Sequence, residues 1–340
     1  MSEMGVRMAI VYVSCAGDHA IHVLELAADG GLRTVEVTTV PAPDGESSSM
    51  PLALDGRHLF AAVRAAPYPA SSFSVAADGR LRWLGSADLP AAMAYITTDG
   101  ASRVLLGASY HGSVLMRMAI GADGVPRGPA QVIVTPPKAH SIITDPAGRW
   151  IYAAVLGGDA ILRLDIDPAS GEMVLRDRTA VRAGAGPRHL RFRPDGRFLY
   201  AINELDATVD AFAVKDGALA HVQTVALLPP GTTGAIAAAD IHLTPDGALL
   251  FASERLSNTL SSFRVDTASG LLSPAGVVPA EASPRGFAID PAGRFLLCAG
   301  QTSNHVTVHA ISADGTLRMI VRHAVGDNPN WVTFLGECPA

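Results

Sequence analysis

The sequence is poor in cysteine and in long hydrophobic runs, and each shortage excludes a class of protein. Its three cysteines, Cys15, Cys298 and Cys338, show no CxxC spacing, which argues against a disulfide framework or a zinc knuckle and favours a reducing compartment. The N-terminal apolar run 8–13 is shorter than a signal-peptide core, and no stretch reaches the roughly 18 apolar residues that span a bilayer. We therefore expect a cytoplasmic protein without membrane contact.

Charge is also scarce. Only 17% of residues are charged and the net charge is −6, which gives no reason to expect a nucleic-acid partner. The chain is instead rich in apolar residues (49%), with 33 glycines and 23 prolines spread along its length. This composition is typical of a compact body with much buried surface and many turns.

One kind of turn recurs along the chain, in forms such as ADGG, ADGR, KDGA and ASGL. Its glycines lie 45 to 53 residues apart, at Gly30, Gly79, Gly124, Gly171, Gly217, Gly270 and Gly315. A second kind, in forms such as DPAGRWIYAAV and PDGRFLYAIN, lies between them. Its glycines are Gly56, Gly100, Gly148, Gly196, Gly247 and Gly293. Such turns between apolar runs indicate hairpins, so each repeat contains four antiparallel strands.

Four-stranded repeats of this length predict the blades of a β-propeller. Seven copies of the first turn predict seven blades in an all-β chain, taken as one domain over residues 1–340. Near the N-terminus, residues 9–17 read AIVYVSCAG, which resembles the second strand of a blade, and the missing first strand fits NPNWVTFLG, residues 328–336. We therefore expect one blade to contain strands from both ends, which leaves no open sheet edge.

Blade topology brings two sets of residues to one end of the central channel. These are the residues at the start of the innermost strands and those in the loops that follow the second strands. The first set contains His140, Arg188, His189, His242, Arg285 and Trp331. The second set contains Arg64, His111, Asn203, Glu204, Arg255 and Gln301. The Asp-Gly turns lie at the opposite end, so we expect the functional site away from them.

Arg64, Arg188, Arg255 and Arg285 make the expected site cationic in an acidic protein. Because guanidinium groups match carboxylate and phosphate, we expect a small anionic ligand. The alternative is that these arginines pair with acidic residues of adjacent blades. Three histidines raise a similar choice, since they could bind a metal with Glu204 or Asp240 or could form hydrogen bonds between blades. The second interpretation is favoured for the histidines: His140, His189 and His242.

Four segments carry a family resemblance: GPRHLRFRPDGRFLYAINELDATV, ADIHLTPDGALLFASERLSNTL, SPRGFAIDPAGRFLLCAGQTSNHV and GDNPNWVTF. They resemble the seven-bladed propeller lactonases, which include cycloisomerase-type 6-phosphogluconolactonases and 3-carboxy-cis,cis-muconate lactonizing enzymes. The resemblance implies that no metal or cofactor is needed. It also implies that His140, Arg188, Glu204 and Arg285 are catalytic, with His189, His242 and Arg255 lining the same site.

The sequence departs from the phosphogluconolactonase pattern at Tyr68, His111 and Glu254. Both 6-phosphogluconolactone and dicarboxylic glucaro- or galactaro-1,5-lactones therefore stay open as substrates. In our hypothesis Glu204 or His140 is the base, Arg188 stabilises the oxyanion and Arg255 and Arg285 bind the anionic tail.

Two other functions are weighed beside lactone hydrolysis. A muconate-type cycloisomerase would use the same cationic site with His140 as the proton donor to carbon. A non-enzymatic propeller that binds a protein partner would need an exposed aromatic patch, which an aromatic content of 6% disfavours. We expect a monomer or weak homodimer.

Overall fold

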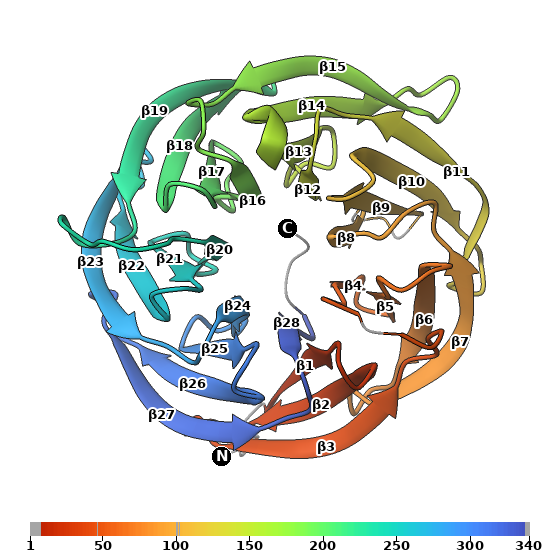
Figure 1. Ribbon diagram of the computed structural model, residues 1–340, viewed down its shortest axis with the longest axis horizontal. Helices are drawn as coiled ribbons and strands as arrows, with labels where there is room; N and C mark the ends of the chain where they lie inside the picture. The colour runs from red at the N-terminus through yellow and green to blue at the C-terminus, as the bar shows by residue number, and fades with distance from the viewer. Residues whose placement is uncertain (1–7, 46, 100, 102, 337–340) are drawn as a thin grey trace, which may run out of the picture.

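The computed structural model describes the chain except for residues 1–7, 46, 100, 102 and 337–340. Within the described residues, 28 strands form seven antiparallel sheets of four strands each. The sheets are arranged as blades around a central axis, with each innermost strand nearest that axis (Figure 1). The predicted seven-bladed propeller is therefore confirmed.

Each blade has one strand in each of four layers. The innermost strands are β28 (Pro329–Phe334), β4 (Leu52–Leu54), β8 (Tyr95–Thr98), β12 (Ala139–Thr144), β16 (Pro187–Phe192), β20 (Ala238–Leu243) and β24 (Pro284–Ile289). The second strands are β1 (Ala9–Cys15), β5 (His58–Ala62), β9 (Val104–Ser109), β13 (Ile151–Val155), β17 (Phe198–Asn203), β21 (Leu249–Glu254) and β25 (Phe295–Gly300). The third strands are β2 (Ala20–Leu26), β6 (Pro69–Val75), β10 (Val114–Ile120), β14 (Ala160–Ile166), β18 (Thr208–Lys215), β22 (Thr259–Val265) and β26 (His305–Ile311). The outer strands are β3 (Leu32–Thr39), β7 (Leu81–Asp88), β11 (Pro126–Val134), β15 (Met173–Ala180), β19 (Ala218–Ala226), β23 (Leu272–Pro279) and β27 (Leu317–Ala324).

The ring closes inside one blade, as the sequence predicts. β1, near the start of the chain, pairs with β2 on one side and with β28 on the other, with Val13 opposite Val332. Figure 1 shows β28 and β1 side by side. Because the innermost strand of this blade comes from the far end of the sequence, backbone hydrogen bonds join the two ends of the ring.

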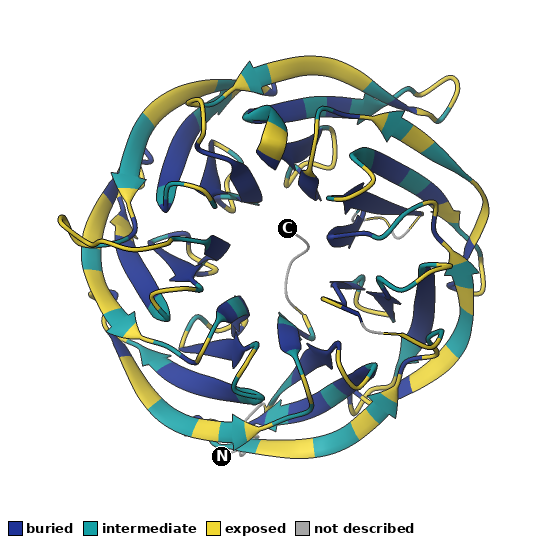
Figure 2. Ribbon diagram, viewed as in Figure 1, coloured by how far each residue is buried: buried dark blue, intermediate teal, exposed yellow. Residues whose placement is uncertain are grey.

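Burial falls from the inside of each blade to its outside. The second strands are almost entirely buried, whereas the outer strands alternate between exposed and half-buried residues (Figure 2). Cys15 and Cys298 are buried in these layers, and Cys338 lies outside the described residues. Among the described residues the one helix is the three-residue η1 (Leu156–Gly158), so none is long and apolar enough to cross a membrane.

The predicted turns lie where the sequence places them. The first kind joins the third and outer strands and the second kind joins the innermost and second strands, both at one end of the channel. Gly100 lies outside the described residues. We call this end the turn face, and the opposite end, with the loops after the second strands, the loop face.

Turns of the first kind also hold neighbouring blades together. The buried hydroxyl of Tyr200 in β17 donates a hydrogen bond of 2.9 Å to the carbonyl oxygen of Gly270 in the next blade. Tyr152 makes the same bond to Gly217 at 2.7 Å. Gly270 has a φ of +73° and a Cβ there would overlap the ring of Phe198, so this glycine serves both the turn and the blade contact.

Two glycine substitutions separate these roles. Gly171 lies in the same kind of turn, with a φ of +71°, but a Cβ there has no neighbour within 4 Å. We expect Gly171→Ala to cost about 1–2 kcal/mol of unfolding free energy through backbone strain. Gly270→Ala should cost about 1–3 kcal/mol more because of overpacking against Phe198. Urea unfolding of both variants measures the difference, and equal losses would contradict a role of Gly270 in blade contact.

Candidate active site

β-bulges mark the loop-face end of the innermost strands. The strand register shifts at His140 in β12, at Arg188 in β16, at Ala239–Asp240 in β20 and at Arg285 in β24. A bulge leaves a residue outside the ladder and redirects its side chain. It explains how Arg188 and His189, which regular alternation would place on opposite faces, contact each other at 3.1 Å. Four consecutive blades thus direct polar side chains toward the same space.

Glu204 lies between two arginines. Its carboxylate forms ion pairs with Nε of Arg188 at 2.8 Å and with Nη2 of Arg255 at 3.1 Å. Arg188 is 2% exposed and also donates to the carbonyl oxygen of Ala239. Burial, and next the nearby Arg255, lower the pKa of Arg188 to about 10. The structure therefore brings together the predicted hairpin residues Arg188 and Glu204 and the predicted Arg255 of the following blade.

His189 and Asp240 lie beside Arg188 and contact each other. Nδ1 of His189 lies 2.7 Å from the Asp240 carboxylate, and Nε2 faces Arg188. Burial and then the charge of Arg188 lower the pKa of His189 to about 3, so its imidazole is neutral at physiological pH.

His140 and Arg285 have unused polar groups in this space. Nδ1 of His140 is buried without a hydrogen-bond partner among the described residues, and its ring lies 5.2 Å from that of His189. Burial, and next the charges of Arg188 and other site residues, hold the pKa of His140 well below its ordinary value. In the described part of the chain Arg285 has no ion pair with an acidic residue. Burial and the nearby Arg188, Arg255 and Arg64 hold the pKa of Arg285 well below its ordinary value.

Three other predicted residues contact loop residues. Arg64, half-buried, donates to the hydroxyl of Ser49 at 3.1 Å. His111 is exposed, next to Tyr110, whose ring lies 5.8 Å from that of His140. Gln301 donates to Asn328 at 2.9 Å and joins two loops. Their substrate contacts stay predictions.

Two other residues named from the sequence support the loops that carry the site. Asn203 is fully buried and donates from Nδ2 to Thr208 and to Asp210, both at 2.9 Å. Glu254, 1% exposed, accepts from the backbone N–H groups of residues 237, 256 and 257. These bonds fix the turns from which Glu204 and Arg255 project.

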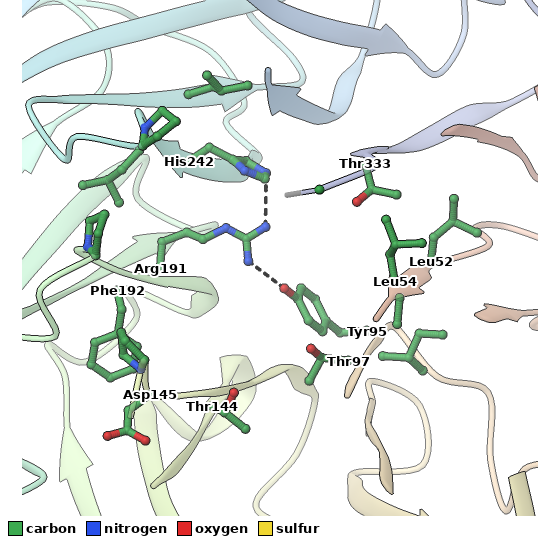
Figure 3. A pocket seen from close by; sticks show the side chains of 18 of the residues that line it. Leu52, Leu54, Tyr95, Thr97, Thr144, Asp145, Arg191, Phe192, His242 and Thr333 are labelled. Atoms are coloured by element: carbon green, nitrogen blue, oxygen red, sulfur yellow. Dashed lines mark hydrogen bonds between the residues drawn. The ribbon is translucent and has the colours of Figure 1, made fainter. Parts of the chain in front are cut away.

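A cavity of about 820 Å³ occupies the channel toward the turn face. Arg191 lies in its wall, 2.8 Å from the hydroxyl of Tyr95 and 3.2 Å from Nε2 of His242 (Figure 3). His242 and Trp331, both predicted to bind substrate, line this cavity. The rings of Tyr95, Trp331 and His189 contact one another, with centroids 5.1 to 6.0 Å apart. They lie between the cavity and the arginine cluster.

Sequence reasoning missed Tyr95 and the contact between Asp240 and His189. Tyr95 occurs in AYITTDG at the start of an innermost strand, the same position that identified the other site residues, so the signal was present. For the metal interpretation, no group of three or more His, Cys, Asp or Glu side chains that could hold an ion occurs among the described residues.

The arrangement joins the carboxylates of Glu204 and Asp240 and two neutral histidines to a cluster of guanidinium groups in a partly buried space. Glu204 can accept a proton, and Arg188 can stabilise negative charge that develops beside it. Arg285 can bind a further anionic group.

The depressed pKa of His140 predicts a pH-dependent stability. Unfolded histidine binds a proton near pH 6.5 whereas folded His140 does not, so stability should fall as pH drops below about 6.5. Each such histidine contributes up to about 1.4 kcal/mol per pH unit. Urea unfolding between pH 7 and pH 5 should therefore show a shallower dependence for His140→Gln than for the wild type. An unchanged slope would contradict a neutral buried His140.

Comparison with known proteins agrees with this geometry. A model of the family described as "Lactonase, 7-bladed beta-propeller" matches residues 10–334. A 6-phosphogluconolactonase from Pectobacterium carotovorum is 38% identical over 96% of this chain and 98% of its own. One from Serratia proteamaculans is also 38% identical, over 96% of this chain and 99% of its own.

Solved structures give the same result. The periplasmic gluconolactonase of Pseudomonas aeruginosa has a TM-score of 0.88 and 27% identity, covering 96% of this chain and 99% of its own. A putative 6-phosphogluconolactonase from Bacteroides fragilis has a TM-score of 0.86 and 28% identity, covering 98% and 99%. The resemblance found in the sequence is thus confirmed, and the chain belongs to the seven-bladed β-propeller lactonase family.

Proposed function

We propose that the protein hydrolyses the 1,5-lactone of an anionic sugar acid to the open acid, at the loop-face end of the channel. Candidate substrates are 6-phosphoglucono-1,5-lactone and glucaro- or galactaro-1,5-lactones. The observation that carries the proposal is the position of Glu204 between Arg188 and Arg255, next to Arg285. Relatives named 6-phosphogluconolactonase support it.

In the proposed reaction a water molecule attacks the lactone carbonyl carbon while Glu204 takes its proton. Arg188 stabilises the oxyanion that forms on the carbonyl oxygen. The bond from the carbonyl carbon to the ring oxygen then breaks, and the proton passes to that oxygen, giving a hydroxyl and a carboxylic acid that ionises. His140, neutral, buried beside His189 and with no hydrogen-bond partner on Nδ1 among the described residues, orients the water or the substrate.

In the proposed complex the anionic tail of the substrate binds Arg285, whose positive charge has no ion pair with an acidic residue in the described part of the chain. Arg285 lies near Arg188, Arg255 and Arg64, whose positive charges lower its pKa. The negative charge of Glu204 acts in the opposite direction and raises it. A phosphate or a free carboxylate on the sugar lactone offsets the repulsion among these positive charges and holds the lactone ring in place.

Cycloisomerase chemistry fits this site less well. It requires His140 to donate a proton to carbon, whereas burial and the nearby charge of Arg188 hold the pKa of His140 low and favour its neutral form. As part of the proposal we expect a cytoplasmic protein that is a monomer or weak homodimer, with no nucleic-acid partner and no cofactor or metal.

Glu204→Gln tests the base. The amide keeps the shape of the side chain but cannot accept a proton, so turnover should fall by roughly 10²- to 10⁴-fold. Proton release from freshly prepared 1,5-lactones at constant pH measures the rate. Glu172→Gln, an exposed change near the turn face, serves as the control and should match the wild type. Near-normal turnover of Glu204→Gln would reject Glu204 as the base.

Arg285→Gln tests the anion site. Its KM for the anionic lactone should rise about 10- to 100-fold, because hydrogen bonds to charged groups contribute about 1.5–3 kcal/mol. Glucono-1,5-lactone carries no anionic group, so its KM should change much less. Steady-state kinetics on both substrates gives the comparison, and equal effects on the two lactones would contradict the proposed tail contact.

A further inference from the structure

The carboxylate of Asp240 accepts from groups in three successive blades. Its Oδ1 lies 2.7 Å from Nδ1 of His189 in β16 and accepts from the backbone N–H of Ile241 at 2.9 Å. Its Oδ2 accepts from the backbone N–H of Phe287 in β24 at 3.3 Å and lies 3.3 Å from Nε2 of His242. The shorter contacts thus belong to the oxygen that faces His189.

The contacts of His189 fix which of its nitrogens carries the proton. Arg188 can only donate hydrogen bonds, so Nε2 of His189, 3.1 Å from Nη1 of Arg188, must accept. The proton of the neutral ring is then on Nδ1, where the Asp240 carboxylate accepts it. The contacts with Arg188 and with Asp240 therefore both favour the Nδ1–H tautomer of His189.

The protonation states agree with this geometry. Burial, followed by the charge of Arg188, lowers the pKa of His189 to about 3, so the ring carries one proton. Burial acts to raise the pKa of Asp240, but His242 and His189 together hold it well below its ordinary value. Asp240 is therefore an ionised group that can only accept.

We infer that Asp240 is a positioning residue for lactone hydrolysis: it holds His189 in the Nδ1–H tautomer, whose Nε2 fixes the guanidinium of Arg188 toward the reacting carbonyl group. The inference rests on the proposed role of Arg188. Nη1 of Arg188 lies between His189 and the carbonyl oxygen of Ala239, while Nε faces Glu204. Without Asp240 the His189 ring can take the other tautomer, which presents an N–H to Arg188 and pushes the guanidinium out of place.

Asp240→Ala and Asp240→Asn test this inference together. In the alanine variant kcat should fall about 10- to 100-fold with a smaller change in KM, as expected when an orienting partner is lost. The asparagine variant should recover part of this loss. Its carbonyl oxygen can still accept from His189 and Ile241, but its NH₂ group then faces the backbone N–H of Phe287, which the carboxylate accepts in the wild type.

A double-mutant cycle shows whether Asp240 acts through His189. In a His189→Gln background, Asp240→Ala should cause little further loss of kcat. Asp290→Ala is the matched control, because Asp290 is also a buried carboxylate that accepts from backbone N–H groups, those of residues 292, 294 and 295. It should lower the melting temperature without lowering kcat.

The tautomer itself can be read in the wild-type protein by ¹H–¹⁵N correlation of the histidine side chains. The expected spectrum of His189 has the proton on Nδ1 and a lone pair on Nε2. A proton on Nε2, wild-type kcat in Asp240→Ala, or an equal loss of kcat in the His189→Gln background each overturns the inference. The spectrum does not depend on activity, so absence of lactone hydrolysis in the wild type would reject the proposed function separately.

Discussion

The buried guanidinium of Arg188 is the constraint on which the rest of the site depends. A charge taken out of water is tolerated only when it is paired and hydrogen-bonded. The partners of Arg188 come from separate elements: Glu204 follows β17, Ala239 belongs to β20 in the next blade, and His189 is its neighbour along β16. Two blades must therefore keep a fixed relative position for this charge to stay buried.

The ring supplies that fixed position. Tyrosines in second strands donate to glycine carbonyls in the following blade near the turn face, at the opposite end of the channel from the arginine cluster. The bulges lie at the other end of the same sheets, where the ladder is interrupted and the backbone redirects His140, Arg188 and Arg285. Regular hydrogen-bonded pairing of the strands thus maintains the blades, and the bulges that interrupt this pairing direct side chains into the candidate site.

Local sequence signals account for most of the fold. An Asp-Gly turn with a positive φ and the alternation of apolar residues are properties of short segments, so seven blades and the closing strand β28 could be predicted. The same reasoning placed Arg188 and Glu204 at one end of a hairpin. The pairing of Arg255 with Glu204 crosses a blade boundary, and its partner could not be chosen from sequence spacing.

Bulges were beyond sequence reasoning for a related reason. A bulge follows from register between two strands, and the register of β20 against β21 shifts over Ala239–Asp240 without a distinctive local sequence. The support given by Asn203 and Glu254 was missed because both stand next to charged or polar residues that do enter the site. Neighbours in sequence here have opposite roles, one in the loop framework and one in the channel.

The charge balance of the site also bears on how a product leaves. In the proposed reaction a neutral ester becomes a carboxylate, so the product carries one more negative charge than the substrate. Arginines alone would hold it more tightly than the lactone, and release would limit turnover. Glu204 returns to its anionic form once its proton has passed to the ring oxygen, beside the new carboxylate. The repulsion between Glu204 and the product carboxylate opposes the attraction of Arg188 and Arg255. In the proposed reaction Glu204 therefore has a second role, in product release.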